Sequence, residues 1–167
     1  MLRRALLSAL VLLPACGGGS SGPVAPAGTP LRLEADALDL GPATTTAELT
    51  VRLAGEPQLS PVALQVAVEL PPALSLAAGS KLVPATTLAT LDGDVIDGRF
   101  LIVCGDAQNV VATPLAKGPL FRVRLATSTP RQPGTYQVQL TGLRASTAGG
   151  EDVAVEAAPT VVQVVIR

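Results

Sequence analysis

From Leu31 onward, apolar side chains recur at every second position, and this pattern restricts the fold more than any other feature of the chain. A β-strand places successive side chains on opposite faces, whereas a helix repeats its apolar positions at intervals of three and four. The alternation is clearest over residues 49–53, 64–70, 121–125, 136–140 and 162–166. We therefore expect strands, each with one buried and one exposed face, and no helices.

Glycine and proline bound these segments and predict turns between the strands. Examples are Gly41-Pro42, Pro71-Pro72, Gly118-Pro119 and Pro133-Gly134. Many short strands with one wet face each are typical of an antiparallel β-sandwich. Residues 31–167 are enough for one domain with a single core. The sequence thus predicts an all-β fold, an antiparallel β-sandwich, over residues 31–167.

The first fifteen residues have the layout of a secretory signal. Arg3 and Arg4 give a positive start, and the apolar run 5–13 is too short to span a bilayer. The tetrapeptide that ends in Cys16, Leu-Pro-Ala-Cys, resembles the lipobox of bacterial lipoproteins, whose cysteine is acylated and becomes the first residue after cleavage. We expect residues 1–15 to be a lipoprotein signal peptide and Cys16 to be lipidated. Ordinary cleavage nearby, which would leave Cys16 as a spare thiol, is the alternative.

Residues 16–30 are predicted to be a flexible linker. Glycine and serine fill residues 17–22, and Pro23, Pro26 and Pro30 disfavour both helix and ladder pairing. Flexible chain of this length spans about 20 Å, enough to hold a domain just clear of a lipid surface. Gly17, not aspartate, follows the cysteine, which is compatible with export to the outer membrane. The membrane is thus one expected partner, and the expected location is the bacterial cell envelope, at the outer membrane or the cell surface.

The composition argues against several functions. The twelve basic residues fall to ten when Arg3 and Arg4 leave with the signal, against thirteen acidic residues, so the basic stripe of a nucleic-acid partner is not expected. The chain has no histidine, which removes the common histidine-based catalytic and metal sites. A pair of carboxylates could still converge, but a lined substrate cleft needs more than two phenylalanines and one tyrosine. We expect neither an enzyme nor a cofactor.

Cys104 has no partner for an internal disulfide when Cys16 is acylated, because the chain has two cysteines. It continues the alternating pattern of Phe100 and Ile102, which predicts a buried apolar thiol. An intermolecular disulfide is the alternative.

The acidic stretch 91–98 suggests calcium, with Asp92, Asp94 and Asp97 as weak candidate ligands. An EF-hand loop needs oxygen ligands at positions one, three and five and glycine at six. Counted from Asp92, position five is Ile96 and the glycine falls at seven, so the spacing fails. The favoured interpretation is a pair of tight Asp-Gly turns that lead into a strand at Arg99.

The order of segments resembles the cohesin family. The strand 62–70, the corner 71–76 and Gly79 are similar to the cohesin strand, corner and glycine, although the corner lacks the family's Tyr-Asp. Residues 98–103 and 118–125 are similar to two later cohesin strands, and residues 133–138 with the closing strand to Ile166 complete the pattern. The resemblance implies a jelly-roll sandwich related to carbohydrate-binding modules, with one sheet face that receives a dockerin.

A candidate binding face follows from the alternation. If Phe100, Ile102 and Cys104 point inward, Leu101 and Val103 must point outward. We expect the strand 62–70 on one side of them and the strand 119–126 on the other, which gives an apolar centre with a polar rim. The predicted face consists of Gln65, Glu69, Leu101, Val103, Arg122 and Arg124. In cohesins the sheet with the matching strands receives the partner. The alternative is that the loop 105–117 covers Leu101 and Val103.

Three functions remain open. The first is a surface-tethered module that binds a protein, dockerin-like or another envelope protein. The second is a carbohydrate-binding module, although Phe100, Phe121 and Tyr136 are expected to turn inward and so provide no exposed platform. The third is a structural envelope lipoprotein with an immunoglobulin-like sandwich and no specific ligand.

Overall fold

The computed structural model describes residues 28–106 and 112–167 of the 167-residue chain. The predicted signal 1–15, the lipidation site Cys16 and most of the linker lie outside these residues. No helix that could cross a bilayer occurs in the part that is described. The first strand begins at Thr29, slightly before the predicted boundary, and Pro30 lies inside it at an irregular step of the pairing. This strand is at a sheet edge, where a proline is tolerated.

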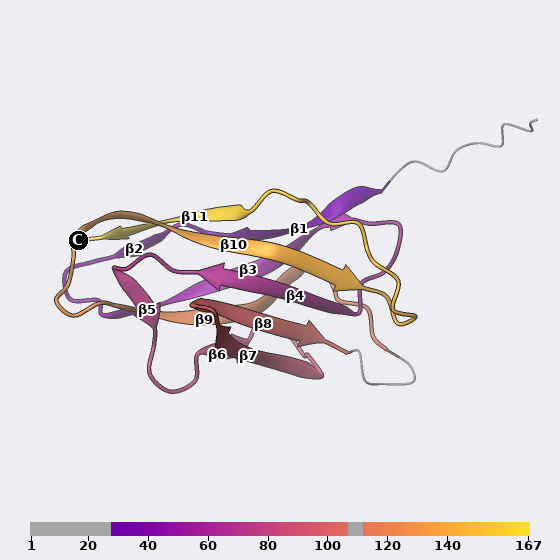
Figure 1. Ribbon diagram of the computed structural model, residues 1–167, viewed down its shortest axis with the longest axis horizontal. Coiled ribbons are helices and arrows are strands. Elements are labelled where there is room, and N and C mark those ends of the chain that lie inside the picture. The colour runs from indigo at the N-terminus through magenta and orange to yellow at the C-terminus, as the bar shows by residue number, and fades with distance from the viewer. Residues whose placement is uncertain (1–27, 107–111) are drawn as a thin grey trace, which may run out of the picture.

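Eleven strands make up the described domain: β1 (Thr29–Ala35), β2 (Leu38–Leu40), β3 (Thr46–Glu56), β4 (Ala63–Glu69), β5 (Leu74–Leu76), β6 (Leu82–Pro84), β7 (Thr90–Ile96), β8 (Arg99–Gly105), β9 (Gly118–Thr127), β10 (Gly134–Ser146) and β11 (Thr160–Ile166). The long strands run along the long axis of the domain, with the start of β1 and the C-terminus at opposite ends (Figure 1).

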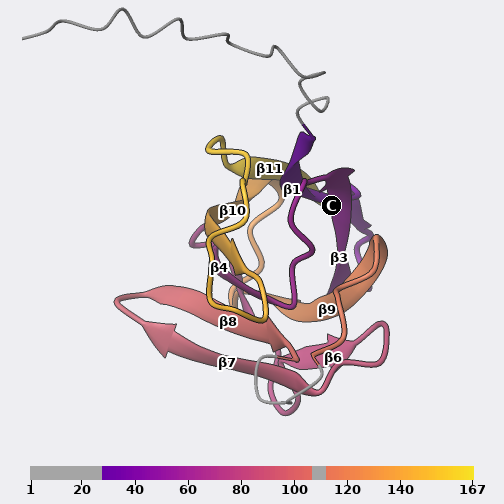
Figure 2. The same ribbon diagram turned by 90° about the vertical axis from the view of Figure 1, so that its right-hand side faces the viewer.

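The strands form two sheets. One sheet has the order β1-β3-β9-β5, with β6 also paired to β9, and the other has the order β2-β11-β10-β4-β8-β7. All pairs are antiparallel except β2 with β11. Viewed along the long axis, the sheets curve around a common core and the β7–β8 hairpin extends from them (Figure 2). The predicted all-β sandwich is confirmed.

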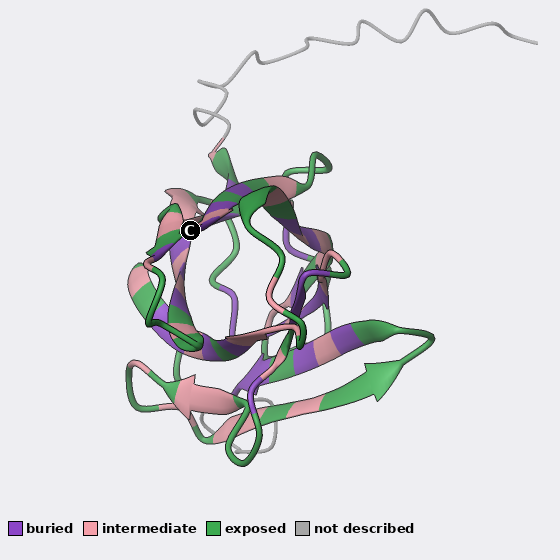
Figure 3. Ribbon diagram, turned by 90° about the vertical axis from the view of Figure 1, so that its left-hand side faces the viewer, coloured by how far each residue is buried: buried purple, intermediate pink, exposed green. Residues whose placement is uncertain are grey.

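The core lies between the sheets, where the alternation predicts it. The buried inward residues of the five predicted segments are Leu49, Val51, Leu53, Leu64, Val66, Val68, Phe121, Val123, Leu125, Val138, Leu140, Val162, Val164 and Ile166. Leu70 and Tyr136 are half-buried and pack against the same cluster. Figure 3 shows buried and exposed residues alternating along the strands. No polar or charged side chain is buried among the described residues, so the core is held by apolar burial.

The acidic stretch contains one turn, not two. Asp97 and Gly98 have φ angles of 51° and 76° and form the predicted hairpin turn. The prediction of a second turn at Asp92-Gly93 is wrong, because these residues lie inside β7. Gly93 faces the interior there, where an added Cβ would lie 2.7 Å from Cζ of Phe100. The glycine therefore makes room for an aromatic ring and does not break the strand.

The predicted order of strands is wrong at one place. β8 pairs with β4, as expected, but its other neighbour is β7. The strand β9 lies in the opposite sheet, between β3 and the short strands β5 and β6. The outward residues of β8 and β9 therefore belong to opposite surfaces of the sandwich.

Candidate functional site

The outward surface of the six-stranded sheet is the candidate binding site, and we call it the six-strand face. It carries four of the six predicted face residues, Gln65, Glu69, Leu101 and Val103. The register places further residues beside them: Ala67, Asp92, Asp94, Ile96, Arg99, Gln139, Thr141, Arg144 and Val161. Arg122 and Arg124 are not part of this face, because β9 belongs to the other sheet. Their predicted place on it is wrong.

The centre of the six-strand face is apolar and accessible. Val103 is 41% exposed, and Leu101 is half-buried beside it on β8. Ile96 and Val161, at 49% and 48%, add exposed apolar area toward β7 and β11. The alternative that the loop 105–117 covers this centre falls partly on residues 107–111, which lie outside the described part of the chain.

The inward side chains of β8 are buried, as the alternation predicts. Phe100, Ile102 and Cys104 are buried. Burial raises the pKa of the Cys104 thiol to about 12, from an ordinary value of 9.0. The thiolate is the reactive form, so this buried cysteine is chemically inert at neutral pH. The buried-thiol interpretation is confirmed.

Two adjoining hollows lie on the six-strand face. The larger, about 320 Å³, has Ala67 and Gly142 among its lining, with Arg99, Leu101 and Arg144 around them. The smaller, about 230 Å³, has Val103, Arg144 and Asp152 among its lining. Gln65 and Arg144 border both hollows, so these two side chains lie at the middle of the site.

The acidic candidates do not form a metal site. Asp92 and Asp94 each accept a hydrogen bond at 2.8 Å from the backbone N–H of the following residue. Asp97 lies apart from them in the hairpin turn. Among the described residues there is no group of three or more acidic or cysteine side chains that could hold a metal ion. The alternative of a calcium site, which the spacing already disfavours, gains no support from the arrangement of these side chains.

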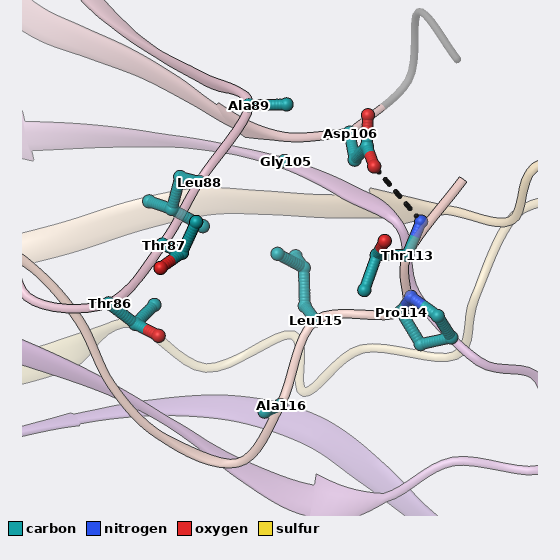
Figure 4. Close-up of a pocket in the computed structure, with 10 residues that line it drawn as sticks. All are labelled: Thr86, Thr87, Leu88, Ala89, Gly105, Asp106, Thr113, Pro114, Leu115 and Ala116. Carbon is teal, nitrogen blue, oxygen red and sulfur yellow. Dashed lines mark hydrogen bonds between the residues drawn. The ribbon is translucent and has the colours of Figure 1, made fainter. Parts of the chain in front are cut away.

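A separate pocket of about 330 Å³ is lined by residues that precede β7, follow β8 and precede β9 (Figure 4). The segment before β7 gives Thr86, Thr87 and Leu88, and the described part of the loop before β9 gives Thr113 and Leu115 (Figure 4). The backbone N–H of Thr113 donates a hydrogen bond of 3.1 Å to Asp106, which ties this loop to the end of β8. The pocket has hydroxyls and aliphatic groups, with one carboxylate among its ten lining residues.

The aromatic side chains offer no platform for a sugar. Phe100 and Phe121 are 2% and 0% exposed. Tyr136 packs partly against the core, and its hydroxyl donates a hydrogen bond of 3.1 Å to the Gln132 carbonyl. All three turn inward, as the alternation predicts.

Comparison with known proteins identifies the fold. No family model and no curated protein matches the sequence. Solved structures do match. CaCohA2 from Clostridium acetobutylicum is 14% identical with a TM-score of 0.65, over 83% of this chain and 92% of that one. The Coh-OlpC module from Clostridium thermocellum, solved in a type I cohesin–dockerin complex, is 9% identical with a TM-score of 0.64, over 86% and 99%.

A non-cellulosomal cohesin from the archaeon Archaeoglobus fulgidus is 15% identical with a TM-score of 0.57, over 83% of this chain and 92% of that one. The domain has a cohesin fold. The resemblance in the sequence is thereby confirmed at the level of the fold, and at these identities the likeness concerns the fold alone.

Within this cohesin fold, sequence reasoning missed the most central charged residue of the site, Arg144. The strand β10 contains an irregular step between Thr141 and Arg144, where two residues have no counterpart in the register with β4. A glycine inside an alternating run is the sequence signal of such a bulge, and Gly142 was available as that signal.

Proposed function

We propose that this chain is a non-enzymatic binding module of the cell envelope that engages a protein partner through the six-strand face. The observation that carries the proposal is the position of the exposed apolar side chains. Ile96, Val103 and Val161 lie on this face, whereas no large apolar residue of the other sheet is exposed. An apolar centre with glutamine and charged groups around it is the usual composition of a protein interface.

The solved structures support a protein partner. The similar Clostridium thermocellum module was solved as a complex with a dockerin. A dockerin-like protein is therefore the first kind of partner to test for this chain. A chain without histidine and without an exposed aromatic platform suits protein binding better than catalysis or sugar binding.

The test is a pull-down from envelope extract with the full chain purified in detergent. Leu101→Asn plus Val103→Asn keeps the strand but makes the centre of the face polar. Thr50→Asn, on β3 of the opposite sheet, is the matched control. We expect one specific protein to be retained by the wild type and by the control and lost by the double variant. Equal retention by all three chains, with the folds intact, would rule out this face as the binding site.

The proposal includes a lipid anchor at Cys16. The lipobox-like tetrapeptide and the glycine-rich segment after it support acylation and a tether. Labelling with a radioactive fatty acid should mark the wild type and not Cys16→Ser, which should also stay unprocessed. Cys104→Ser is the control and should be labelled like the wild type. Lipid label on Cys16→Ser would contradict the anchor.

A further inference from the structure

Arg144 faces outward because of the irregular step in β10. Leu140 points into the core, so strict alternation would point residue 144 inward as well. The register instead pairs Thr141 with Ala67 and Arg144 with Gln65, which leaves Gly142 and Leu143 opposite a single residue of β4. The bulge reverses the phase of the strand: Ala145 is buried and Arg144 is exposed. A bulge that re-aims one side chain is a recurring feature of binding and active sites.

The bulge also shapes the larger hollow. Gly142 has a φ angle of 62°, and no atom lies within 4 Å of the position where its Cβ would be. Ala67 adds only a methyl group next to it. Two small residues, Ala67 and Gly142, thus line the hollow together with the two arginines Arg99 and Arg144. The two cations come from β8 and β10, on either side of β4.

Arg144 has no partner within the described part of the chain. The other arginines there each make an ion pair or hydrogen bonds, whereas Arg144 makes neither. The carboxylates of the six-strand face interact with groups other than Arg144. Glu69 accepts a hydrogen bond of 2.9 Å from Thr141 and lies 3.9 Å from Arg99. Asp92 and Asp94 accept hydrogen bonds on β7. Asp152 borders the smaller hollow without forming an ion pair with Arg144.

We propose that the larger hollow receives an aspartate or glutamate side chain of the protein partner, between Arg99 and Arg144. A guanidinium binds a carboxylate through parallel N–H donors, which gives direction as well as attraction. The neighbouring Leu101 and Val103 favour an aliphatic residue next to that acid in the partner. The partner segment is therefore acidic and aliphatic. This inference rests on the proposed function, because it names the partner chemistry for the same face.

The probe is a phage-displayed library of random dodecapeptides, panned on the full chain purified in detergent. We expect the selected peptides to be enriched in aspartate and glutamate next to aliphatic residues. The consensus peptide and its Glu→Gln or Asp→Asn form are then tested on the wild type and on Arg144→Ala. Arg124→Ala, an arginine of the opposite surface, is the matched control. Arg144 is exposed, so its replacement leaves the core untouched.

On the wild type, neutralising the peptide acid should weaken binding about 10-fold, in the range measured for close charge pairs. The Arg144→Ala variant should bind the acidic peptide about as weakly as the wild type binds the neutral one, and it should bind both peptides with equal affinity. The Arg124→Ala variant should have the affinities of the wild type for both peptides. Panning on Arg144→Glu should select basic peptides in place of acidic ones. Equal affinity of wild type and Arg144→Ala for the acidic peptide would overturn the inference, as would selection of peptides without acid enrichment.

The variant Val103→Asn separates the two proposals. If it abolishes peptide binding while Arg144→Ala and the neutralised peptide have no effect, the six-strand face binds protein but the acidic contact is wrong. If peptides bind both Val103→Asn and Arg144→Ala as well as the wild type, or if none is selected, the proposed function itself fails and the inference fails with it.

Discussion

The two outer surfaces of this sandwich are built by the same alternation and yet differ in composition. On the surface of the five-stranded sheet, the five-strand face, every arginine lies near a carboxylate. Arg32 pairs with Glu34 at 2.8 Å, and Arg52 pairs with Asp36 at 2.6 Å. On β9, Arg122 and Arg124 lie 3.9 and 3.4 Å from Glu48.

The six-strand face has the opposite character. It exposes Val103 at its centre and Ile96 on the edge strand β7, and its arginine at the bulge has no partner in the described residues. Exposed ion pairs such as those of the five-strand face contribute little to stability but satisfy their charges locally. The pKa of Asp36 is lowered mainly by its hydrogen bond to Arg52, which marks such a satisfied pair. This difference indicates that the five-strand face is suited to contact with water and the six-strand face to contact with a partner.

The comparison between the two faces assumes that both sheets pack equally firmly against the shared core. Phe121 lies under the five-strand face and Phe100 under the six-strand face, and both are buried. Each change to alanine should lower the free energy of unfolding by about 3–5 kcal/mol, because a buried ring leaves a cavity. Chemical denaturation measures both. A loss below about 1 kcal/mol for Phe100→Ala alone would show that β7 and β8 are loosely attached and would break the comparison.

A second pair of variants compares Arg131, which makes several hydrogen bonds, with Arg144, which makes none in the described residues. Arg131 donates four hydrogen bonds of 2.7–2.9 Å to the carbonyls of Thr44, Leu40, Gly41 and Arg167. Arg131→Ala should cost about 2 kcal/mol, since four carbonyls lose a charged donor. Arg144→Ala should stay within about 0.5 kcal/mol of the wild type. Thermal or chemical unfolding of both variants is the measurement, and an equal loss would mean that Arg144 is structural.

The thiol under the six-strand face gives a pH test. Because burial raises the pKa of Cys104 to about 12, the folded protein keeps a proton that the unfolded chain releases above pH 9.0. The unfolded state then binds fewer protons, so the free energy of unfolding falls as the pH rises, by up to about 1.4 kcal/mol per unit. Urea unfolding at pH 8 and 10 should show this loss in the wild type and not in Cys104→Ala. The same pH dependence in both proteins would contradict burial of this thiol.

The bulge that aims Arg144 outward depends on Gly142. Its positive φ angle disfavours any side chain, so Gly142→Ala should cost about 1 kcal/mol. Gly149→Ala is the matched control, because that glycine has no positive φ angle and no close contact. Urea unfolding compares the two variants. No difference between them would mean that the strand accepts another geometry at the bulge, and the orientation of Arg144 would lose its explanation.

Much of the sandwich was predictable because the alternation depends only on neighbours in the sequence. It predicts correctly that Phe100, Ile102 and Cys104 are buried and that Val103 is exposed. It does not reveal strand order, since β9 would show the same alternation in either sheet. For this reason the alternation alone places Arg122 and Arg124 on the wrong surface.

The remaining errors concern glycines. The Asp92-Gly93 pair predicts a turn, whereas in the fold Gly93 faces the ring of Phe100 inside β7. Gly142 interrupts the alternation of β10 and shifts its phase, which moves Arg144 to the six-strand face. In both cases the role of the glycine depends on how two strands pair, β7 with β8 for Gly93 and β10 with β4 for Gly142. A local sequence pattern does not contain this pairing.

The most direct test places a photo-reactive amino acid at the centre of each face of the full chain in intact cells. Val103 and Thr50 are the matched positions, on β8 and β3. Illumination should cross-link position 103 to one discrete protein, and position 50 should give no such product above background. A product from position 50, or equal products from both, would contradict the claim that the six-strand face is the surface that binds a partner.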